Sequence, residues 1–539
     1  MTASVEPSLH RGGPDPEDEQ PGHAQDHVGR MARNGGRSII GAAVSAIAGV
    51  ALTAIITNGL DQSAAGTVFA TTALFLIATS LVQLGTEVGV VRYLPALLLR
   101  GQARHLRAVL RHALIPVVVA SVVAAGLCFV FAPTIARSVA DGANPDLVTQ
   151  QIRVLALFLP LTSSYNVLQA ATRGLRSMGA TVVVESFGRT VGQVVAVGLV
   201  QLMGLGAVAV VAAYSIPYAL GLVATLVWLV ALLRRFERKT GPARDDRGAG
   251  AAGSRADAVR GFWGFTAPRA VGTTSQMLLK RSDIVLGAAL RSPKEAALYA
   301  AASRFVVIGQ LGVQALQQAL SPQLAALFAD DDQDSARVVY RATTAWSMLV
   351  AWPVYLVCAV LAPELLRVFG KGYDSVAPVA VLLSLAMLAS TACGAVDTVL
   401  LMSGHTWLSL GNNVLALVLN VGLNLLLVPH YGALGAGVSW TVAILVRNLL
   451  PLIQVTMKYK ISPISRETVL VGVFAATCFG LFPLAVRLLT DGSGPVVAAL
   501  VVGSAAYAAL MWRLRVELQM SAFRGILRRR AGRVVVSAG

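Results

Sequence analysis

The sequence predicts an all-α polytopic membrane protein with about 14 transmembrane helices, and three observations agree on this class. Hydrophobic residues make up 55% of the 539 residues and charged residues only 13%, whereas a soluble domain carries about 25% charged residues. Apolar runs long enough to cross a bilayer recur along the chain, with Gly and Pro inside them as in spanning helices. The alternating pattern of a transmembrane β-barrel is absent.

The first 35 residues are polar and contain no apolar segment of the kind found in a signal peptide, so we expect a disordered cytoplasmic tail. Apolar runs follow, separated mostly by short connections. The expected spans lie near residues 38–59, 65–89, 111–132, 151–171, 179–202, 206–233, 263–289, 296–320, 341–362, 376–402, 407–428, 433–456, 467–488 and 494–513.

The basic residues fix the expected orientation of these spans. The formal net charge is +17, which in a soluble protein would suggest a nucleic-acid partner. With the N-terminus in the cytoplasm, however, 31 of the 44 basic residues fall on cytoplasmic segments and six on the opposite side. The positive-inside rule therefore places both termini in the cytoplasm. The basic segments then face anionic lipid headgroups, and no nucleic acid is needed.

An internal repeat divides the chain into two halves. Gly174 and Gly404, Gly206 and Gly435, and Pro95 and Pro322 are three pairs of landmarks at an offset of about 230 residues. Each repeat holds six spans, so both have the same orientation, and we expect two pseudo-symmetric bundles that rock around a midline cavity to give alternating access. The expected organisation is a tail over 1–35, a bundle over 36–233, a linker over 234–261, a bundle over 262–458, two extra helices over 459–515 and a basic tail over 516–539.

One stretch carries a family resemblance. It contains Phe369-Gly370 with Tyr373, Gly404 in an inner turn, Asn420 and Asn424 in the eleventh span, and Pro429 with Tyr431-Gly432 before Gly435-Ala436. Gly66, Gly85, Arg92 and the Arg173-Gly174 turn match in the first half. Over about residues 38–460 the chain resembles oligosaccharide-lipid flippases of the multidrug/oligosaccharidyl-lipid/polysaccharide exporter superfamily. The resemblance implies an inner-membrane flippase that moves polyprenyl-linked sugars outward, with glycosyltransferases or a polymerase of the same pathway as further partners.

Charges inside a span are costly and are therefore candidates for function. The basic ones are Arg153, Arg189, Arg269, Lys280, Arg281, Arg304 and Arg447. We expect Arg269, which is deep in the seventh span, to grip a diphosphate together with Arg189, Arg304 or Arg447, because the guanidinium fork suits phosphate oxygens. Lys280 and Arg281 are near the outer end, where they could either bind the substrate or extend to the membrane interface.

The acidic residues inside the spans are Glu87, Glu185, Asp283 and Asp397. We expect Glu185 to pair with Arg189 four residues later, and Asp283 to pair with Lys280. The four carboxylates are also candidates for coupling transport to H⁺ or Na⁺. We find no ATP-binding P-loop and no histidine deep in a span. No catalytic residue, metal site or other cofactor is predicted.

The sequence is compatible with several functions. A multidrug or cation antiporter of the same superfamily would transport cations, which an excess of basic residues in the spans disfavours. A glycan polymerase or ligase would need a large outer loop, and no connection on that side is long enough. A scaffold that acts through its tails and a lipid II flippase also remain open. The sequence therefore predicts a transporter of an anionic lipid-linked glycan rather than an enzyme.

Overall fold

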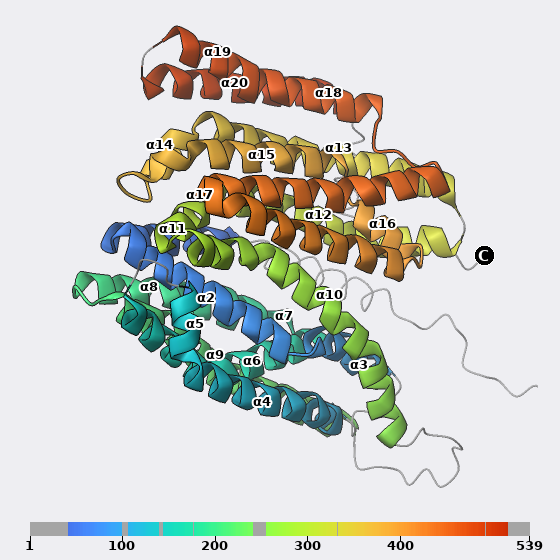
Figure 1. The fold of residues 1–539 in the computed structure, drawn as a ribbon. Coiled ribbons are helices and arrows are strands. Elements are labelled where there is room, and N and C mark those ends of the chain that lie inside the picture. The colour runs from blue at the N-terminus through green and yellow to red at the C-terminus, as the bar shows by residue number, and fades with distance from the viewer. Residues whose placement is uncertain are drawn as a thin grey trace, which may run out of the picture.

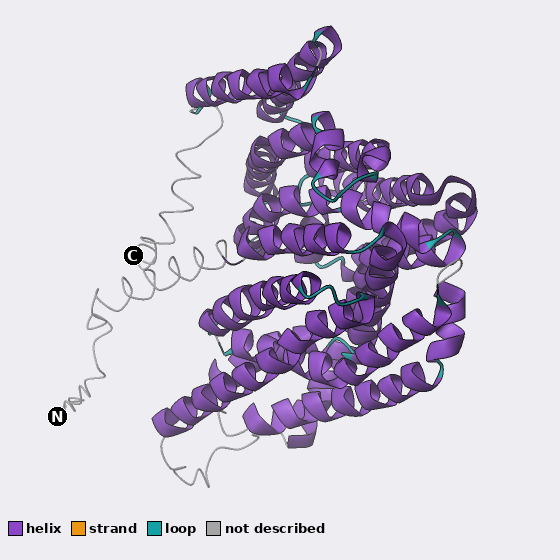
Figure 2. Cartoon of the chain, turned by 90° about the vertical axis from the view of Figure 1, so that its left-hand side faces the viewer, coloured by secondary structure: helices purple, strands orange, loops and turns teal. Residues whose placement is uncertain are grey.

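A computed structural model of the chain describes residues 41, 43–99, 106–139, 144–175, 177–240, 255–330, 332–490 and 492–515. All regular secondary structure in these ranges is helical (Figure 2), which confirms the predicted all-α class. The expected tails over 1–35 and 516–539 lie outside the described residues.

Within the described ranges, 11 helices are long and apolar enough to cross a membrane. One of them, α17 (Thr406–Tyr459), has 54 residues and contains two expected spans, because Gly432 interrupts it with φ 56° and ψ −131°. The apolar helix Ala43–Gly59 is shorter than the others, and α10 (Arg255–Leu290) carries more charge. The number of about 14 spans therefore stays a prediction.

The helices pack in two groups and an outer layer (Figure 1). The first group is formed by α2 (Gln62–Val82), α3 (Thr86–Leu99), α4 (Leu106–Val130), α5 (Ala132–Val139), α6 (Pro145–Gly174), α7 (Met178–Ala180), η3 (Thr181–Arg189), α8 (Thr190–Leu202) and α9 (Ala207–Thr240). The second is formed by α10, α11 (Pro293–Ala302), α12 (Arg304–Ala329), α13 (Gln333–Val360), α14 (Ala362–Arg367), η4 (Tyr373–Val376), α15 (Ala377–Ala392), α16 (Val396–Met402) and α17.

The outer layer follows α17 in sequence. It consists of α18 (Arg466–Ala475), η5 (Ala476–Leu481), α19 (Phe482–Leu489) and α20 (Ser493–Arg513), and α18 packs on α13 at the edge of the second group (Figure 1). Gly503 allows α20 to pack closely on η5, since a Cβ at this position would lie 2.2 Å from the carbonyl oxygen of Cys478.

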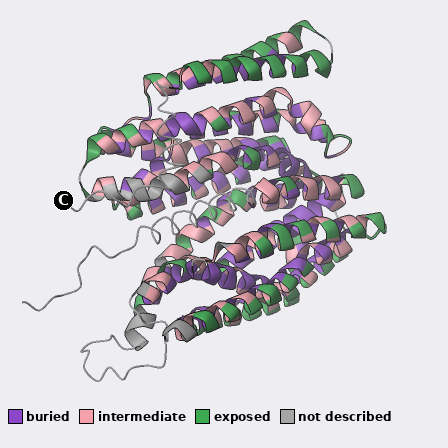
Figure 3. Cartoon of the chain, turned by 180° about the vertical axis from the view of Figure 1, so that it is seen from behind, coloured by how far each residue is buried: buried purple, intermediate pink, exposed green. Residues whose placement is uncertain are grey.

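Helices α4, α8 and α9 expose apolar side chains, and exposed (green) segments lie on the outside of the molecule (Figure 3). On α4 the exposed side chains include Val119, Val122 and Val123, whereas the purple buried residues gather between the helices. An apolar face of this length is stable only against hydrocarbon.

Several expected spans are interrupted, because a residue with positive φ breaks the helix. The second expected span ends at Val82, and α3 restarts after Leu84 and Gly85, which have φ of 52° and 71°. Gly85 also allows close packing, since a Cβ there would lie 2.7 Å from the backbone nitrogen of Ala270 in α10. The tenth expected span breaks at Gly394, with φ 68°, between α15 and α16.

The expected linker over 234–261 is shorter in the structure. Helix α9 continues to Thr240, and α10 begins at Arg255. Only residues 241–254 separate the two helices, and these lie outside the described residues.

Helices α2, α3, α4 and α5 of the first group contact α10 of the second. Helix α2 packs along α10 and α11, with Gly66 of α2 against the backbone of Pro293 at the start of α11. Near the same end of the molecule, Asn58 Nδ2 donates to the carbonyl of Val368 at 2.9 Å, and Gln62 Nε2 donates to the carbonyl of Lys371 at 3.1 Å. In the predicted orientation these contacts close the outer side.

Candidate functional site

Most of the basic residues predicted for the site lie together where the two groups meet. Lys280 and Arg281 of α10, Arg304 at the start of α12 and Arg447 of α17 interact electrostatically, Lys280 with both Arg281 and Arg447, and Arg281 with Arg304. Tyr214 of α9 lies in electrostatic range of Arg281, Arg304 and Arg189. We call these five basic residues (Arg189, Lys280, Arg281, Arg304 and Arg447) the central cation cluster.

Two members of the central cation cluster lack partners. The Nε–H groups of Arg281 and Arg304 are buried and have no hydrogen-bond acceptor in the described residues. Neither guanidinium forms an ion pair within that part of the chain. Buried charges are normally paired, and like charges side by side repel each other. The arrangement is therefore suited to an incoming anion.

Arg189 is held in a different way. It donates to Gln193 Oε1 at 3.1 Å and to the Tyr218 hydroxyl at 3.4 Å, and it lies over the Tyr218 ring at 5.1 Å from the centroid. The predicted pair with Glu185 is wrong, because Glu185 forms an ion pair with Arg173 of α6 at 3.4 Å. Residues 181–189 form a π-helix, whose wider turns change the angle between residues four apart.

Arg269, the preferred candidate from the sequence, lies apart from the central cation cluster. Its guanidinium is 5.7 Å from the centroid of the Phe265 ring, and that of Arg92 in α3 is 4.2 Å from the same ring. We call Arg92 and Arg269 the inner cation pair. Arg92 was not among the site residues predicted from the sequence, although it matches the family resemblance in the first half.

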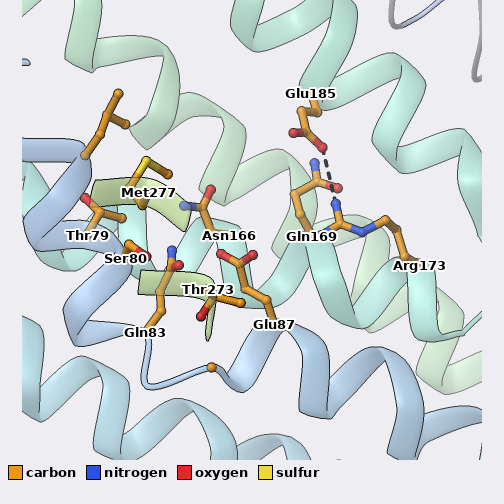
Figure 4. Close-up of a pocket in the computed structure, with 12 residues that line it drawn as sticks. Thr79, Ser80, Gln83, Glu87, Asn166, Gln169, Arg173, Glu185, Thr273 and Met277 are labelled. Carbon is orange, nitrogen blue, oxygen red and sulfur yellow. Dashed lines mark hydrogen bonds and ion pairs between the residues drawn. The ribbon is translucent and has the colours of Figure 1, made fainter. Parts of the chain in front are cut away.

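A polar cavity of about 270 Å³ lies between the first group and α10 (Figure 4). Its walls come from α2, α3, α6, η3 and α10. Three charged side chains line it, Glu87, Arg173 and Glu185, and the Arg173–Glu185 ion pair forms one wall. The other lining residues are Leu76, Thr79, Ser80, Gln83, Gly85, Asn166, Gln169, Thr273 and Met277. The structure thus brings together two of the four predicted carboxylates, Glu87 and Glu185, with a guanidinium that was not predicted.

Asp283 lies in a third place, between α10 and α17. It is 1% exposed, and its carboxylate accepts from Asn420 Nδ2 at 2.9 Å, Asn424 Nδ2 at 2.7 Å and the Tyr299 hydroxyl at 2.9 Å. The predicted pair with Lys280 is wrong, since Asp283 faces α17 and Lys280 forms no ion pair in the described residues. Three neutral donors therefore stabilise a buried carboxylate that forms no ion pair in the described residues.

Asp397, the fourth carboxylate, is in the first turn of α16. It accepts a short hydrogen bond from the Ser409 hydroxyl of α17 and lies in electrostatic range of Arg447. Asp397 therefore lies close to the break at Gly394 and in electrostatic range of the central cation cluster. It does not line the polar cavity.

The fold is similar to that of known membrane transporters. A structure named "Lipid II flippase MurJ, inward closed conformation" has a TM-score of 0.68 at 11% identity, covering 89% of this chain and 98% of that one. An inward-facing multidrug resistance MATE family transporter of the MOP superfamily has a TM-score of 0.64 at 14% identity, covering 77% and 94%. A MOP superfamily transporter from Pyrococcus furiosus has a TM-score of 0.52 at 15% identity, covering 81% and 96%. The chain therefore has the fold of MOP superfamily transporters, with cations gathered between its two helical groups.

The family model for polysaccharide biosynthesis proteins matches residues 69–378, more than half of the chain. The protein belongs to this polysaccharide biosynthesis family. No curated protein matches the chain. The multi-pass membrane protein predicted from the sequence, and its resemblance to the flippase superfamily, are thereby confirmed.

Proposed function

We propose that this protein moves polyprenyl diphosphate-linked sugars across the cytoplasmic membrane by alternating access, for polysaccharide or cell-envelope glycan synthesis. The observation that carries the proposal is the pair of buried Nε–H groups of Arg281 and Arg304 in the central cation cluster, which have no acceptor in the described residues. A diphosphate supplies acceptors for such donors, and a low dielectric strengthens the contact. Glycosyltransferases that build the glycan and a polymerase that uses it afterwards would then act in the same pathway.

The lipid tail needs an apolar path beside the head group. An apolar cavity of about 380 Å³ lies between α13 and α18, lined by Met348, Trp352, Ile464, Val469 and Val473 among others. Hydrocarbon is the natural occupant of such a surface in a bilayer.

A cation antiporter is the competing proposal, and one experiment separates the two. Full-length protein in proteoliposomes is expected to speed the translocation of fluorescent polyprenyl diphosphates that carry glucose, galactose or N-acetylglucosamine, and to leave ethidium movement unchanged. Fluorescent lipid II, assayed in parallel, tests whether the protein is instead a lipid II flippase. Ethidium transport, or translocation of every lipid at the rate of protein-free vesicles, would overturn the proposal.

We further propose that Asp283 couples transport to H⁺ or Na⁺, because binding either cation neutralises a carboxylate that has only neutral partners. Asn424 Oδ1, a buried acceptor with no donor in the described residues, is a second oxygen at this place. Asp283→Asn is expected to translocate lipid without a response to imposed pH or Na⁺ gradients, while Asp374→Asn at the exposed Arg367 pair keeps the response. A wild-type protein that ignores both gradients, or a variant that responds like wild type, would contradict this role.

A further inference from the structure

We infer that the polar cavity binds the sugar attached directly to the diphosphate, as a neutral, hydroxyl-rich ligand. This inference rests on the proposed function. It adds that two neighbouring sites bind different parts of the substrate head group. The central cation cluster takes the phosphates, and the polar cavity takes the first sugar.

The polar cavity contains side-chain groups that lack partners. Gln83 is 7% exposed, and its Nε2 is buried with no hydrogen-bond acceptor in the described residues. Figure 4 shows Gln83 beside Glu87 and Asn166 at the same opening. The side chains of Ser80, Asn166 and Glu87 likewise form no hydrogen bond within the part of the chain that the structure describes. An orphaned buried donor is unfavourable until a ligand supplies an acceptor.

The opposite wall is rigid by comparison. Gln169 is 1% exposed, and its Nε2 donates to Thr225 Oγ1 at 3.1 Å and to the Tyr165 hydroxyl at 3.3 Å. The Arg173–Glu185 ion pair closes the same side. The polar groups without partners therefore lie opposite a wall whose polar groups already form hydrogen bonds and an ion pair, as in a preformed ligand site.

The charges of the polar cavity favour a neutral ligand. Two carboxylates, Glu87 and Glu185, face a single guanidinium, that of Arg173, so a diphosphate would be repelled. A metal ion is not favoured either, because no group of three or more His, Cys, Asp or Glu side chains that could hold one occurs in the described ranges. Carboxamides, hydroxyls and a carboxylate together match the donors and acceptors of sugar hydroxyl and acetamido groups.

The size and the position agree with one sugar ring. At about 270 Å³ the cavity is slightly smaller than typical ligand sites, which have volumes of about 300–1,000 Å³. Met277 in its wall is four residues before Arg281, so the two sites are one helical turn, about 6 Å, apart along α10. A sugar and the diphosphate bonded to it can thus occupy both sites at once.

The test compares lipids with and without a sugar. Full-length protein in detergent is titrated with polyprenyl diphosphate and with the same lipid carrying glucose, galactose or N-acetylglucosamine. Wild type is expected to bind at least one sugar-bearing lipid about tenfold more tightly than the bare diphosphate. Gln83→Met and Asn166→Leu should lose this preference and keep wild-type affinity for the bare lipid, which also reports that they are folded. Asn448→Leu is the matched control, because its amide donates only within its own helix, to Ile444 at 2.7 Å.

The outcomes separate the inference from the proposed function. Equal binding of bare and sugar-bearing lipids by wild type, or an unchanged preference in both cavity variants, would overturn the sugar site and leave the flippase proposal standing. Wild type that binds no polyprenyl diphosphate at all would overturn both. A preference lost in the cavity variants and kept in Asn448→Leu supports the division of the head group.

Discussion

Proteoliposomes that contain the Arg281→Ala, Arg304→Ala double variant are expected to lose translocation of lipid-linked diphosphate sugars by a factor of about 100 or more. A hydrogen bond to a charged group contributes about 1.5–3 kcal/mol, and the variant removes two guanidiniums whose buried Nε–H groups have no acceptor in the described residues. Since about 1.4 kcal/mol is a tenfold change in affinity, two such losses exceed two orders of magnitude. The measurement is the initial rate of translocation per inserted protein.

The same double variant is expected to have an equal or higher unfolding temperature without substrate. The two guanidiniums repel each other and lack acceptors in the described residues, so their removal relieves an unfavourable arrangement. The control is Arg487→Ala, which removes an ion pair to Glu364 at 3.2 Å. That variant should lower the unfolding temperature and keep translocation. A double variant that unfolds earlier than wild type would instead assign Arg281 and Arg304 a structural role.

Gly66→Ala is expected to destabilise the contact between α2 and α11 and to reduce translocation strongly. A Cβ at Gly66 would lie 1.7 Å from the carbonyl oxygen of Pro293, which is backbone and cannot turn away. Separating two packed helices typically costs about 1–3 kcal/mol. The contact joins the two helical groups, so a lower unfolding temperature should accompany a lower rate.

The control for Gly66→Ala is Gly126→Ala in α4, where nothing lies within 4 Å of the added Cβ. Alanine in a helix is favoured over glycine by about 1 kcal/mol, so this variant should be neutral or slightly more stable. If both variants unfold at the same temperature and transport at the same rate, α2 and α11 are not held together as described.

The helical class followed from composition and hydropathy, because any spanning segment must satisfy its own backbone. The interruptions did not follow, since each depends on a backbone dihedral angle. Leu84 and Gly85 end α2 where hydropathy continues, and Gly394 divides an apolar run that reads as one span. Glycines occur in many spans, and most of them do not interrupt the helix. Only the packing against another helix distinguishes the glycines at which a helix breaks.

The types of candidate residue were predictable, but their partners were not. Spacing along one helix suggested the pairs Glu185–Arg189 and Lys280–Asp283, whereas Glu185 contacts α6 and Asp283 contacts α11 and α17. Contacts between helices follow from how the helices are rotated about their axes, which a local spacing rule does not contain. The polar cavity was unforeseen for the same reason, because Gln83, Asn166 and Thr273 come from distant parts of the chain.

Helix α10 is part of the second group and also contacts helices of the first group. Near its start, Phe262 packs on Tyr93 of α3 with ring centroids 5.6 Å apart, and near its end Asp283 is bound to Asn420 and Asn424 of α17. Two bundles that rock as independent rigid bodies would pull this helix from one anchor or the other. Gly264, with nothing within 4 Å of an added Cβ, and Gly272, with one atom only at 3.9 Å, lie between the anchors and leave room for bending. If the two groups move as in the proposed alternating access, α10 is therefore expected to bend between its two anchors rather than to move as a rigid rod.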